Sequence, residues 1–320
     1  MPSVVATEYE NLEIVVADNA STDNSVEWLE HHYPDVKVVQ HPENWAFCRG
    51  NNEAIPHTSG EYILLLNNDV EVSPGWLQPL VDVLDNNPAV AAVQPKLLQY
   101  DNRKAFEYAG GSGGYIDKYG YPFTRGRLFF TLEEDKGQYD DPTDIFWATG
   151  AAVLFRHAAL REVGTLDEVF FMHMEEIDLC WRLKRAGYKI RVEPQSTVYH
   201  IGGASLPYGD ARKTYYNFRN SLIMLYKNLP PKLWVRTFIV RALLDGLAMA
   251  RALLTGRWRE FSAIFRAYLD AHFISKAYED DRPSSIPDAA LPSYDGSIVL
   301  AYFLKRKKTF QRLSESLFRQ

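Results

Sequence analysis

Hydrophobic positions follow two different periods along residues 1–200. Short continuous apolar runs, typical of strands buried on both faces, alternate with stretches whose apolar residues recur every three or four positions, as on one face of a helix. Strands are predicted at residues 12–18, 36–40, 62–66 and 90–98, and helices at residues 25–33, 51–57 and 74–86. This alternation predicts an α/β domain with a mainly parallel sheet covered by helices on both faces.

The strand at residues 62–66 is the most apolar of the set and ends abruptly in polar residues. Asn67, Asn68 and Asp69 follow it directly. In open α/β folds, ligands bind at the carboxyl edge of the strands, where these side chains would lie. Asn and Asp are also the usual residues of turns. Taken alone, the stretch fits a binding site and a simple turn equally well.

The chain is less regular in its middle. Residues 100–146 are rich in Gly, Tyr and Asp and have little periodicity, as expected for a functional lid. The Gly-rich run at residues 110–114 does not join a strand to a helix, so it is not predicted to bind phosphate. Regular structure returns with strands at residues 147–155, 189–192 and 197–200, helices at residues 157–163 and 175–186, and a helical tail beyond residue 210.

Charge is distributed unevenly over the 320 residues. The formal net charge is −6, yet residues 212–276 contain twelve Lys or Arg against three acids. An acidic body with a basic arm predicts that the arm faces something anionic. The acidic body argues against nucleic-acid binding.

Compartment and membrane topology are predicted from three simple features. Cys48 and Cys180 lie in apolar surroundings without metal-binding spacing, which indicates a reducing compartment. The chain does not open with a signal peptide, and it has no run of 18 uncharged apolar residues. We therefore expect a cytoplasmic protein that does not cross the membrane.

The basic arm contains an amphipathic segment at residues 233–255. At 100° per residue, Arg236, Arg241, Asp245 and Arg251 share one half of the helix, and apolar residues fill the other half. Either the helix packs on the protein, or it lies on an anionic membrane surface, where each basic residue contributes ~1 kcal/mol. The sequence leaves both alternatives open.

Acidic residues and one histidine provide candidate chemistry in the second half of the domain. Glu175, Glu176 and Asp178 occupy the first turn of a helix, where the helix dipole alone favours carboxylates. They also suit a general base and a neighbour that tunes its pKa. His200 ends a strand, a position that suits either a structural residue or a ligand.

Taken together, these stretches resemble glycosyltransferase family 2. The resemblance is carried, in order, by residues 18–23 (DNASTD), 44–47 (NWAF), 66–69 (LNND), 150–152 (GAA) and 170–182 (FFMHMEEIDLCWR), and in the tail by residues 216–220 (YNFRN) and 226–230 (YKNLP). It implies a Rossmann-like GT-A fold over residues 1–205, with a basic amphipathic helical extension over residues 206–320. It also implies inverting transfer of a sugar from a nucleotide-diphosphate sugar to a glycan or lipid-linked acceptor, as in polysaccharide and cell-wall biosynthesis.

The family resemblance also assigns a metal site. Asn67, Asn68 and Asp69 stand where the family has its Asp-x-Asp motif, so Asp69 is expected to hold Mg²⁺ or Mn²⁺ between the donor phosphates. His200 matches a histidine that completes the metal site in some relatives, and an imidazole ligand makes Mn²⁺ as plausible as Mg²⁺. Asn67 removes one charge from the motif but keeps an amide for the donor.

The remaining donor-site residues follow from the same motifs. Asp18 matches the position that pairs with the nucleobase, and Asn19 is its neighbour. Asn44 and Arg49 fall in the loop that encloses the nucleoside. The family usually has Gly where Ala46 stands, which predicts a less tightly turned loop.

Catalysis and acceptor binding are assigned to the later motifs. Glu176 is the expected general base, with Glu175 as the alternative. Asp178 is expected either to hold the acceptor or to steady the helix turn. Trp147 would either stack on an acceptor sugar or belong to the core.

One departure from the family concerns the start of the domain. Relatives begin with a strand that contributes to the nucleotide site, and residues 2–7 resemble the end of the helix that follows it. The catalytic domain is therefore predicted to be N-terminally truncated, less stable than its relatives and weak in donor binding, because an inner strand is missing.

Two other functions remain as alternatives. A non-catalytic nucleotide-sugar or glycan-binding subunit would explain both Asn67 and the missing strand. A nucleotidyltransferase is less favoured, because no Gly-rich loop with a basic residue for triphosphate occurs near the first strand. For the transferase, the cytoplasm or the inner face of the plasma membrane is the expected location.

Overall fold

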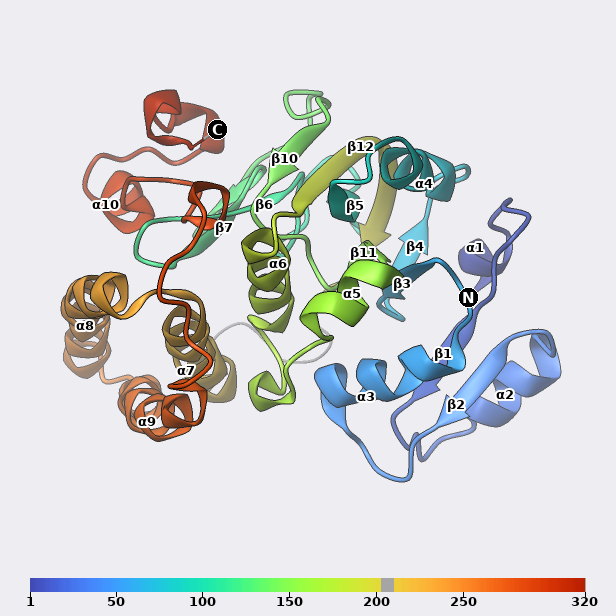
Figure 1. The fold of residues 1–320 in the computed structure, drawn as a ribbon, viewed down its shortest axis with the longest axis horizontal. Helices are drawn as coiled ribbons and strands as arrows, with labels where there is room; N and C mark the ends of the chain where they lie inside the picture. The colour runs from blue at the N-terminus through green and yellow to red at the C-terminus, as the bar shows by residue number, and fades with distance from the viewer. Residues whose placement is uncertain (203–209, 320) are drawn as a thin grey trace.

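A six-stranded mixed sheet lies at the centre of the molecule (Figure 1). The computed structural model describes residues 1–202 and 210–319. The strand order is β10-β12-β5-β11-β3, and β4 pairs with β12 beside this path. The strands are β3 (Tyr62–Leu66), β4 (Val70–Val72), β5 (Val90–Gln99), β10 (Thr143–Ile145), β11 (Ala152–Arg156) and β12 (Lys189–His200).

The predicted α/β class is confirmed, but the sheet is not mainly parallel. Strands β5 and β12 pair in parallel, whereas β11 lies between β3 and β5 and is antiparallel to both. A parallel neighbour needs a long crossover connection, usually a helix. Between β5 and β11 the chain instead passes through residues 100–151, which contain only short strands, so β11 returns in the opposite direction. The two strands predicted at residues 189–192 and 197–200 form the single strand β12.

The first two strands form a separate parallel pair. β1 (Val15–Asp18) pairs with β2 (Lys37–Gln40), and within the described residues neither pairs with the larger sheet. Helices α1 (Pro2–Val5), α2 (Ser25–His32) and α3 (Ala46–Ala54) belong to the same part of the chain. The Glu13 carboxylate accepts hydrogen bonds from the backbone of Ser59 and Gly60. This contact ties the segment before β1 to the segment before β3.

Two hydrophobic clusters cover the two faces of the central sheet. Because side chains alternate along a strand, Ile63 and Leu65 of β3 point into one cluster, and Leu64 and Leu66 pack against the other. The second cluster contains the apolar face of α4 (Leu77–Asn86). The first contains residues of α5 (His157–Val163) and α6 (Glu175–Arg185).

The irregular segment at residues 100–146 is largely folded into a small antiparallel sheet. Its strands are β6 (Gly114–Ile116), β7 (Pro122–Thr124), β8 (Arg127–Leu128) and β9 (Thr131–Leu132). A Cβ atom at Gly114 would lie 2.2 Å from the ring of Trp147, so this position admits only glycine. The segment thus supplies core contacts, whereas the sequence predicted a functional lid.

The tail folds into α7 (Ala211–Asn228), α8 (Pro231–Leu254), α9 (Trp258–Ser275) and α10 (Ile298–Phe303) (Figure 1). Residues 222–225 of α7 are almost fully buried and share a cluster with α5 and α6. The predicted boundary between residues 205 and 206 lies outside the described residues. None of the helices in residues 1–202 and 210–319 has the length and apolar composition needed to span a bilayer.

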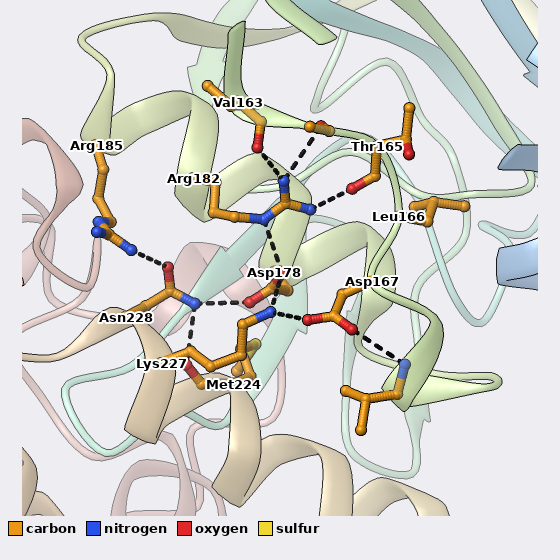
Figure 2. A network of polar contacts seen from close by, with 12 residues as sticks. Val163, Thr165, Leu166, Asp167, Asp178, Arg182, Arg185, Met224, Lys227 and Asn228 are labelled. Carbon is orange, nitrogen blue, oxygen red and sulfur yellow. Dashed lines mark hydrogen bonds and ion pairs between the residues drawn. The ribbon is translucent and has the colours of Figure 1, made fainter. Parts of the chain in front are cut away.

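A buried network of charged residues joins α6 to α7 (Figure 2). Asp178 is fully buried and accepts hydrogen bonds from Lys227 Nζ at 3.0 Å, Asn228 Nδ2 at 2.8 Å and Arg182 Nε at 2.9 Å. Lys227 also pairs with Asp167. Burial alone raises the pKa of Asp178, but the charges of Lys227 and Arg182 outweigh it and lower that pKa below 3.8.

We expect Asp178→Ala to lower the free energy of unfolding by about 3–5 kcal/mol, because Lys227 and Arg182 lose the fully buried carboxylate that they share. Since the pKa of Asp178 is lowered by folding, its contribution is present at neutral pH and is lost as the pH falls below 3.8. Urea unfolding measures the change. The control is Asp144→Ala, which removes an exposed pair with Lys189 and should cost at most about 1 kcal/mol. Equal costs for the two variants would contradict the prediction.

Candidate active site

The ends of β3 and β12 bring Asp69 and His200 together. His200 is paired with Val70 in the β4–β12 ladder, and the Ile201 N–H donates to the Asp69 carbonyl at 3.0 Å. His200 Nε2 lies 3.0 Å from Asp69 Oδ1. On the other side of the ring, His200 Nδ1 lies 3.3 Å from Glu107 Oε1. The imidazole is therefore held between two carboxylates.

The pKa values of His200 and Asp69 are shifted in this cluster. Burial lowers the pKa of His200, but the hydrogen bond to Asp69 and the nearby carboxylate of Glu107 outweigh this effect and raise the pKa to about 9. The hydrogen bond from His200 lowers the pKa of Asp69. At pH 7 the positive imidazolium therefore compensates part of the charge of its neighbours.

The donor set at this edge fits the predicted divalent metal only in part. A carboxylate oxygen of Asp69 and an imidazole nitrogen of His200 suit Mn²⁺ or Mg²⁺. Within the part of the chain that the structure describes, no group of three or more His, Cys, Asp or Glu side chains is arranged to hold a metal. The protein thus offers two ligands, and phosphate oxygens of a bound donor or water would have to supply the others.

Glu107 was not predicted from the sequence. It is buried (4% exposed) and stands behind the histidine, so it is placed to fix the orientation and tautomer of the ring rather than to bind a metal. It lies between β5 and β6, in a segment without periodicity, and nothing in its sequence context distinguishes it from other acids of that segment.

Asn67 and Asn68 connect this pair of strand ends to the loop before β11. The Asn67 N–H donates to the Ala151 carbonyl at 2.9 Å, and Asn68 is exposed. A Cβ atom at Gly150 would lie 3.0 Å from the Phe47 ring and 3.9 Å from Glu176 Cβ. Residues 150–151 therefore bridge β3, α3 and the start of α6, which brings the separated motifs together.

Glu175 and Glu176 begin α6 with raised pKa values. Burial and the neighbouring charge of Glu176 raise the pKa of Glu175 well above its usual value. Burial raises the pKa of Glu176 to about 7. The Oε2 atoms of both carboxyl groups are closed to solvent and have no hydrogen-bond partner among the described residues. Carboxyl oxygens that are closed to solvent without a partner, in groups with shifted pKa values, are typical of functional sites.

The backbone leading into this carboxyl pair is strained. Phe171, His173 and Met174 have φ angles of 63°, 67° and 76°, which non-glycine residues rarely adopt. The Asn220 side-chain amide of α7 donates to the carbonyl oxygens of Phe170, Met172 and His173 at 2.7–2.8 Å. Asn220 belongs to the tail motif at residues 216–220, which predicted no role for it in the site, and the structure places it in direct contact with the segment before Glu175.

Predicted nucleotide-binding residues gather at the start of α3. Asn19 Nδ2 donates to the Ala46 carbonyl at 3.0 Å, and Asn44 Oδ1 accepts from the Ala46 N–H at 2.9 Å. Ala46 adopts φ 56°, a left-handed conformation that glycine adopts more readily than alanine. The expectation of a turn looser than in the family stays a prediction. The two flanking asparagines hold the turn in place.

Asp18 and Arg49 flank this turn. Both carboxylate oxygens of Asp18 accept from the Ser21 N–H, which orders the loop after β1. The Arg49 guanidinium stacks over the Trp45 ring at 3.9 Å from its centroid. Of the four predicted residues, Asn19, Asn44 and Arg49 thus touch one short segment, residues 45–46.

Two predicted site residues have structural roles instead. Trp147 is 5% exposed, and its Nε1–H donates to the Tyr115 carbonyl at 2.9 Å, so the ring belongs to the core and does not stack on a sugar. Asp178 is enclosed by Arg182, Lys227 and Asn228, so it does not hold an acceptor. A cavity of about 560 Å³ beside that network contains none of Asp69, Glu176 or His200 in its lining.

A family model and several known proteins match the chain in sequence. The model of the family described as Glycosyl transferase family 2 matches residues 2–164. A pre-mycofactocin glycosyltransferase of Mycobacterium tuberculosis is 29% identical over 222 residues, which cover 66% of this chain and 42% of that protein. An N-acetylglucosaminyl-diphospho-decaprenol L-rhamnosyltransferase of the same species is 26% identical over 201 residues, covering 58% of this chain and 66% of that protein. The chain thus spans less than two thirds of either relative.

Solved structures match it in fold at low sequence identity. A crystal structure of GalNAc-T7 with UDP, GalNAc and Mn²⁺ has a TM-score of 0.54 at 16% identity, covering 70% of this chain and 44% of that chain. A mannosyltransferase from Pyrobaculum calidifontis in complex with GDP-Man and Mn²⁺ has a TM-score of 0.50 at 14% identity, covering 85% and 82%.

We expect Glu107→Gln to weaken Mn²⁺ binding by about 10- to 100-fold, because His200 loses the carboxylate that fixes its ring. Titration of Mn²⁺ by electron paramagnetic resonance, in the presence of a nucleoside diphosphate, measures the affinity. Glu71→Gln is the matched control: it removes the same charge from β4, where Glu71 pairs with Arg103. An unchanged Mn²⁺ affinity in Glu107→Gln would refute the positioning role.

Proposed function

Because the chain belongs to glycosyltransferase family 2, we propose that it transfers a sugar from a nucleotide-diphosphate sugar to the hydroxyl group of an acceptor. Its fold is the GT-A fold expected from the sequence, as in the solved transferases that it resembles. The observation that carries the proposal is the convergence of Asp69 and His200 at the sheet edge with Glu176 across Gly150. Residues 1–205 would perform the transfer, with residues 206–320 as an extension.

A non-catalytic nucleotide-sugar-binding subunit is the second candidate, favoured by Asn67 in place of an acid. Against it stands the pair Glu175 and Glu176. Each of these carboxyl groups keeps one oxygen closed to solvent without a hydrogen-bond partner among the described residues, which is costly, and a binding subunit would gain nothing from that cost. A general base with a pKa near 7 does gain from it, because such a base is matched to the working pH.

The donor would lie along the carboxyl edge of the strands. Asp18, Asn19, Asn44 and Arg49 would hold the nucleoside, and Asn67 and Asn68 would donate to the diphosphate. Asp69 and His200 would hold Mg²⁺ or Mn²⁺, whose charge offsets the negative charge that develops on the leaving diphosphate. The metal-bound neighbours with UDP and GDP-Man support this choice of donor class and cofactor.

Glu176 would remove the proton from the acceptor hydroxyl. The acceptor oxygen then forms a bond to the anomeric carbon while the bond from that carbon to the diphosphate oxygen breaks. Attack from the face opposite the diphosphate inverts the anomeric configuration. Burial and the charge of Glu176 raise the pKa of Glu175 well above its usual value, which favours the neutral form of Glu175 beside an ionised Glu176.

The acceptor would be a glycan or a lipid-linked sugar in the biosynthesis of a surface polysaccharide or cell wall. The rhamnosyltransferase relative and an O-antigen biosynthesis protein of Myxococcus xanthus, 30% identical over 204 residues, support this class. The expected location is the cytoplasm, with peripheral attachment to the inner face of the plasma membrane.

A panel of nucleotide sugars tests the proposal directly. The chain is heated with each donor in the presence of Mn²⁺, and donors that raise the melting temperature are then incubated with glycan and lipid-linked acceptors while nucleoside diphosphate release is followed. We expect the nucleotide sugars of one nucleoside both to raise the melting temperature of the chain and to be consumed in the reaction. Stabilisation without any turnover would favour the binding subunit instead.

We expect Glu176→Gln to lower kcat by about 10²- to 10⁴-fold with little change in donor affinity, because only the proton acceptor is lost. Since the pKa of Glu176 is raised to about 7, the wild-type kcat should rise as the pH increases through 7, and this limb should vanish in the variant. Glu175→Gln is the companion variant. If it alone abolished turnover, the roles of the two acids would be exchanged.

We expect Asn220→Ala to lower kcat by about 10- to 100-fold, because the strained segment that orients Glu176 loses three hydrogen bonds. Donor affinity should stay within about twofold of the wild-type value, because the displaced segment lies outside the cluster of predicted nucleotide-binding residues. Asn217→Ala, on the same helix, is the control. Full activity in a folded Asn220→Ala protein would show that the contact does not position the site.

A further inference from the structure

Helix α8 is packed with its polar side inward. Its buried residues are Thr237, Arg241, Asp245 and Ala252. Large apolar residues one turn apart are instead exposed, namely Val235, Ile239, Leu243 and Leu247 at 55–68%. A surface helix of a water-soluble protein has the opposite arrangement. The predicted amphipathic segment thus packs on the protein, but with its polar half.

The buried side of α8 is fixed by specific contacts. Arg241 and Asp245 pair at 3.2 Å, and each side chain is 2% exposed. Asp245 accepts from the Tyr121 hydroxyl at 2.5 Å and the Tyr268 hydroxyl at 2.7 Å, and Arg241 donates to Ser221 Oγ at 2.8 Å. Rotating α8 to bury its apolar half would expose these partners and break the network. The exposed apolar face is therefore a property of the folded chain.

Helix α9 repeats this arrangement. Its buried face consists mostly of small residues, including Ala263, Ala267 and Ala271, while Trp258, Phe265, Leu269 and Phe273 are 47–67% exposed. The two helices adjoin, because Asp245 of α8 bonds to Tyr268 of α9 (Figure 1). An exposed apolar surface of this kind marks an interaction site. We call these exposed apolar residues of α8 and α9 the apolar face.

The exposed charged residues of α8, α9 and their connection have one sign. Every charged residue classed as exposed within residues 231–276 is basic: Lys232, Arg236, Arg251, Arg257, Arg259, Arg266 and Lys276. The acids of that segment are covered or paired, Glu260 with Arg257 and Asp270 with Arg266. A second copy of the chain would bring the same positive charges against these, which disfavours self-association.

We propose that the apolar face of α8 and α9 is a docking surface for an anionic lipid bilayer. Apolar side chains would enter the boundary between headgroups and acyl chains, while the basic residues meet the anionic headgroups. No helix in the described residues is able to span a bilayer, so the helices would lie on it. This docking surface rests on the proposed function, because it would present a lipid-linked acceptor to the active site. Vesicle binding is measured without donor or acceptor, so its result is independent of sugar transfer.

Flotation of the whole chain with vesicles tests the proposal. Binding should be strong to vesicles of phosphatidylcholine mixed with phosphatidylglycerol, and weak to phosphatidylcholine alone. Leu243→Ser with Leu247→Ser should lower the partition coefficient at least about tenfold, because two embedded side chains are lost. The matched control, Leu300→Ser with Leu304→Ser, changes exposed apolar residues in and just after α10 and should bind like the wild type.

A second pair of variants tests the charges. Arg251→Gln with Arg259→Gln should weaken binding to the anionic vesicles about fivefold for each charge removed. Lys104→Gln with Lys136→Gln, which lie outside the tail, should have no effect. Circular dichroism checks that all variants are folded, as expected for exposed positions.

Three results would overturn the proposal. They are absence of flotation at low salt, flotation of the Leu243 and Leu247 double variant at the wild-type level, and a wild-type dimer in light scattering that this variant converts to monomer without any vesicle binding. The last result would assign the apolar face to contact between copies. Because none of these readouts uses a nucleotide sugar, failure here leaves the proposed transfer intact, and failure of transfer leaves vesicle binding intact.

Discussion

The contact on which the site depends most is the one between Asn220 and the backbone before Glu175. Three residues with left-handed backbone cost about 1–3 kcal/mol each and persist only where neighbouring structure holds them. Asn220 supplies three hydrogen bonds to that segment, and the network around Asp178 fixes the same helix to α6. The tail is therefore part of the candidate active site, because α7 determines where Glu176 stands.

The surroundings shift the pKa values of the carboxyl groups in the site in opposite directions. His200 lowers the pKa of Asp69, which keeps this group ionised and suited to a cation. Burial raises the pKa of Glu175 and Glu176, which suits proton transfer. Titratable groups whose pKa values are pushed apart in this way indicate separate roles. The same sheet edge thus offers a place for a metal-bound diphosphate and, across Gly150, a base.

Sequence reasoning located the parts of the site that follow strand ends and helix starts. Periodicity indicates where a strand stops, which made Asp69 and His200 candidates, and the family resemblance assigned them to one metal site. The structure brings the two side chains within hydrogen-bonding distance. Periodicity carries no information on contacts between distant segments, so Glu107 and Asn220 were missed as partners of the site. The direction of a strand also depends on tertiary packing, and so does the side of α8 that faces the protein. An amphipathic pattern alone does not reveal that the Arg241 ion pair holds the polar side of α8 inward.

The central claim is that the edge formed by Asp69 and His200 binds a donor diphosphate together with a divalent metal. Anomalous X-ray scattering at the manganese edge, from crystals grown with Mn²⁺ and a nucleoside diphosphate, tests this most directly. We predict one strong peak in contact with Asp69 Oδ, His200 Nε2 and the diphosphate oxygens, with the nucleoside beside Asn19 and Asn44. A manganese peak elsewhere on the chain, or a nucleotide bound away from this edge, would contradict the claim.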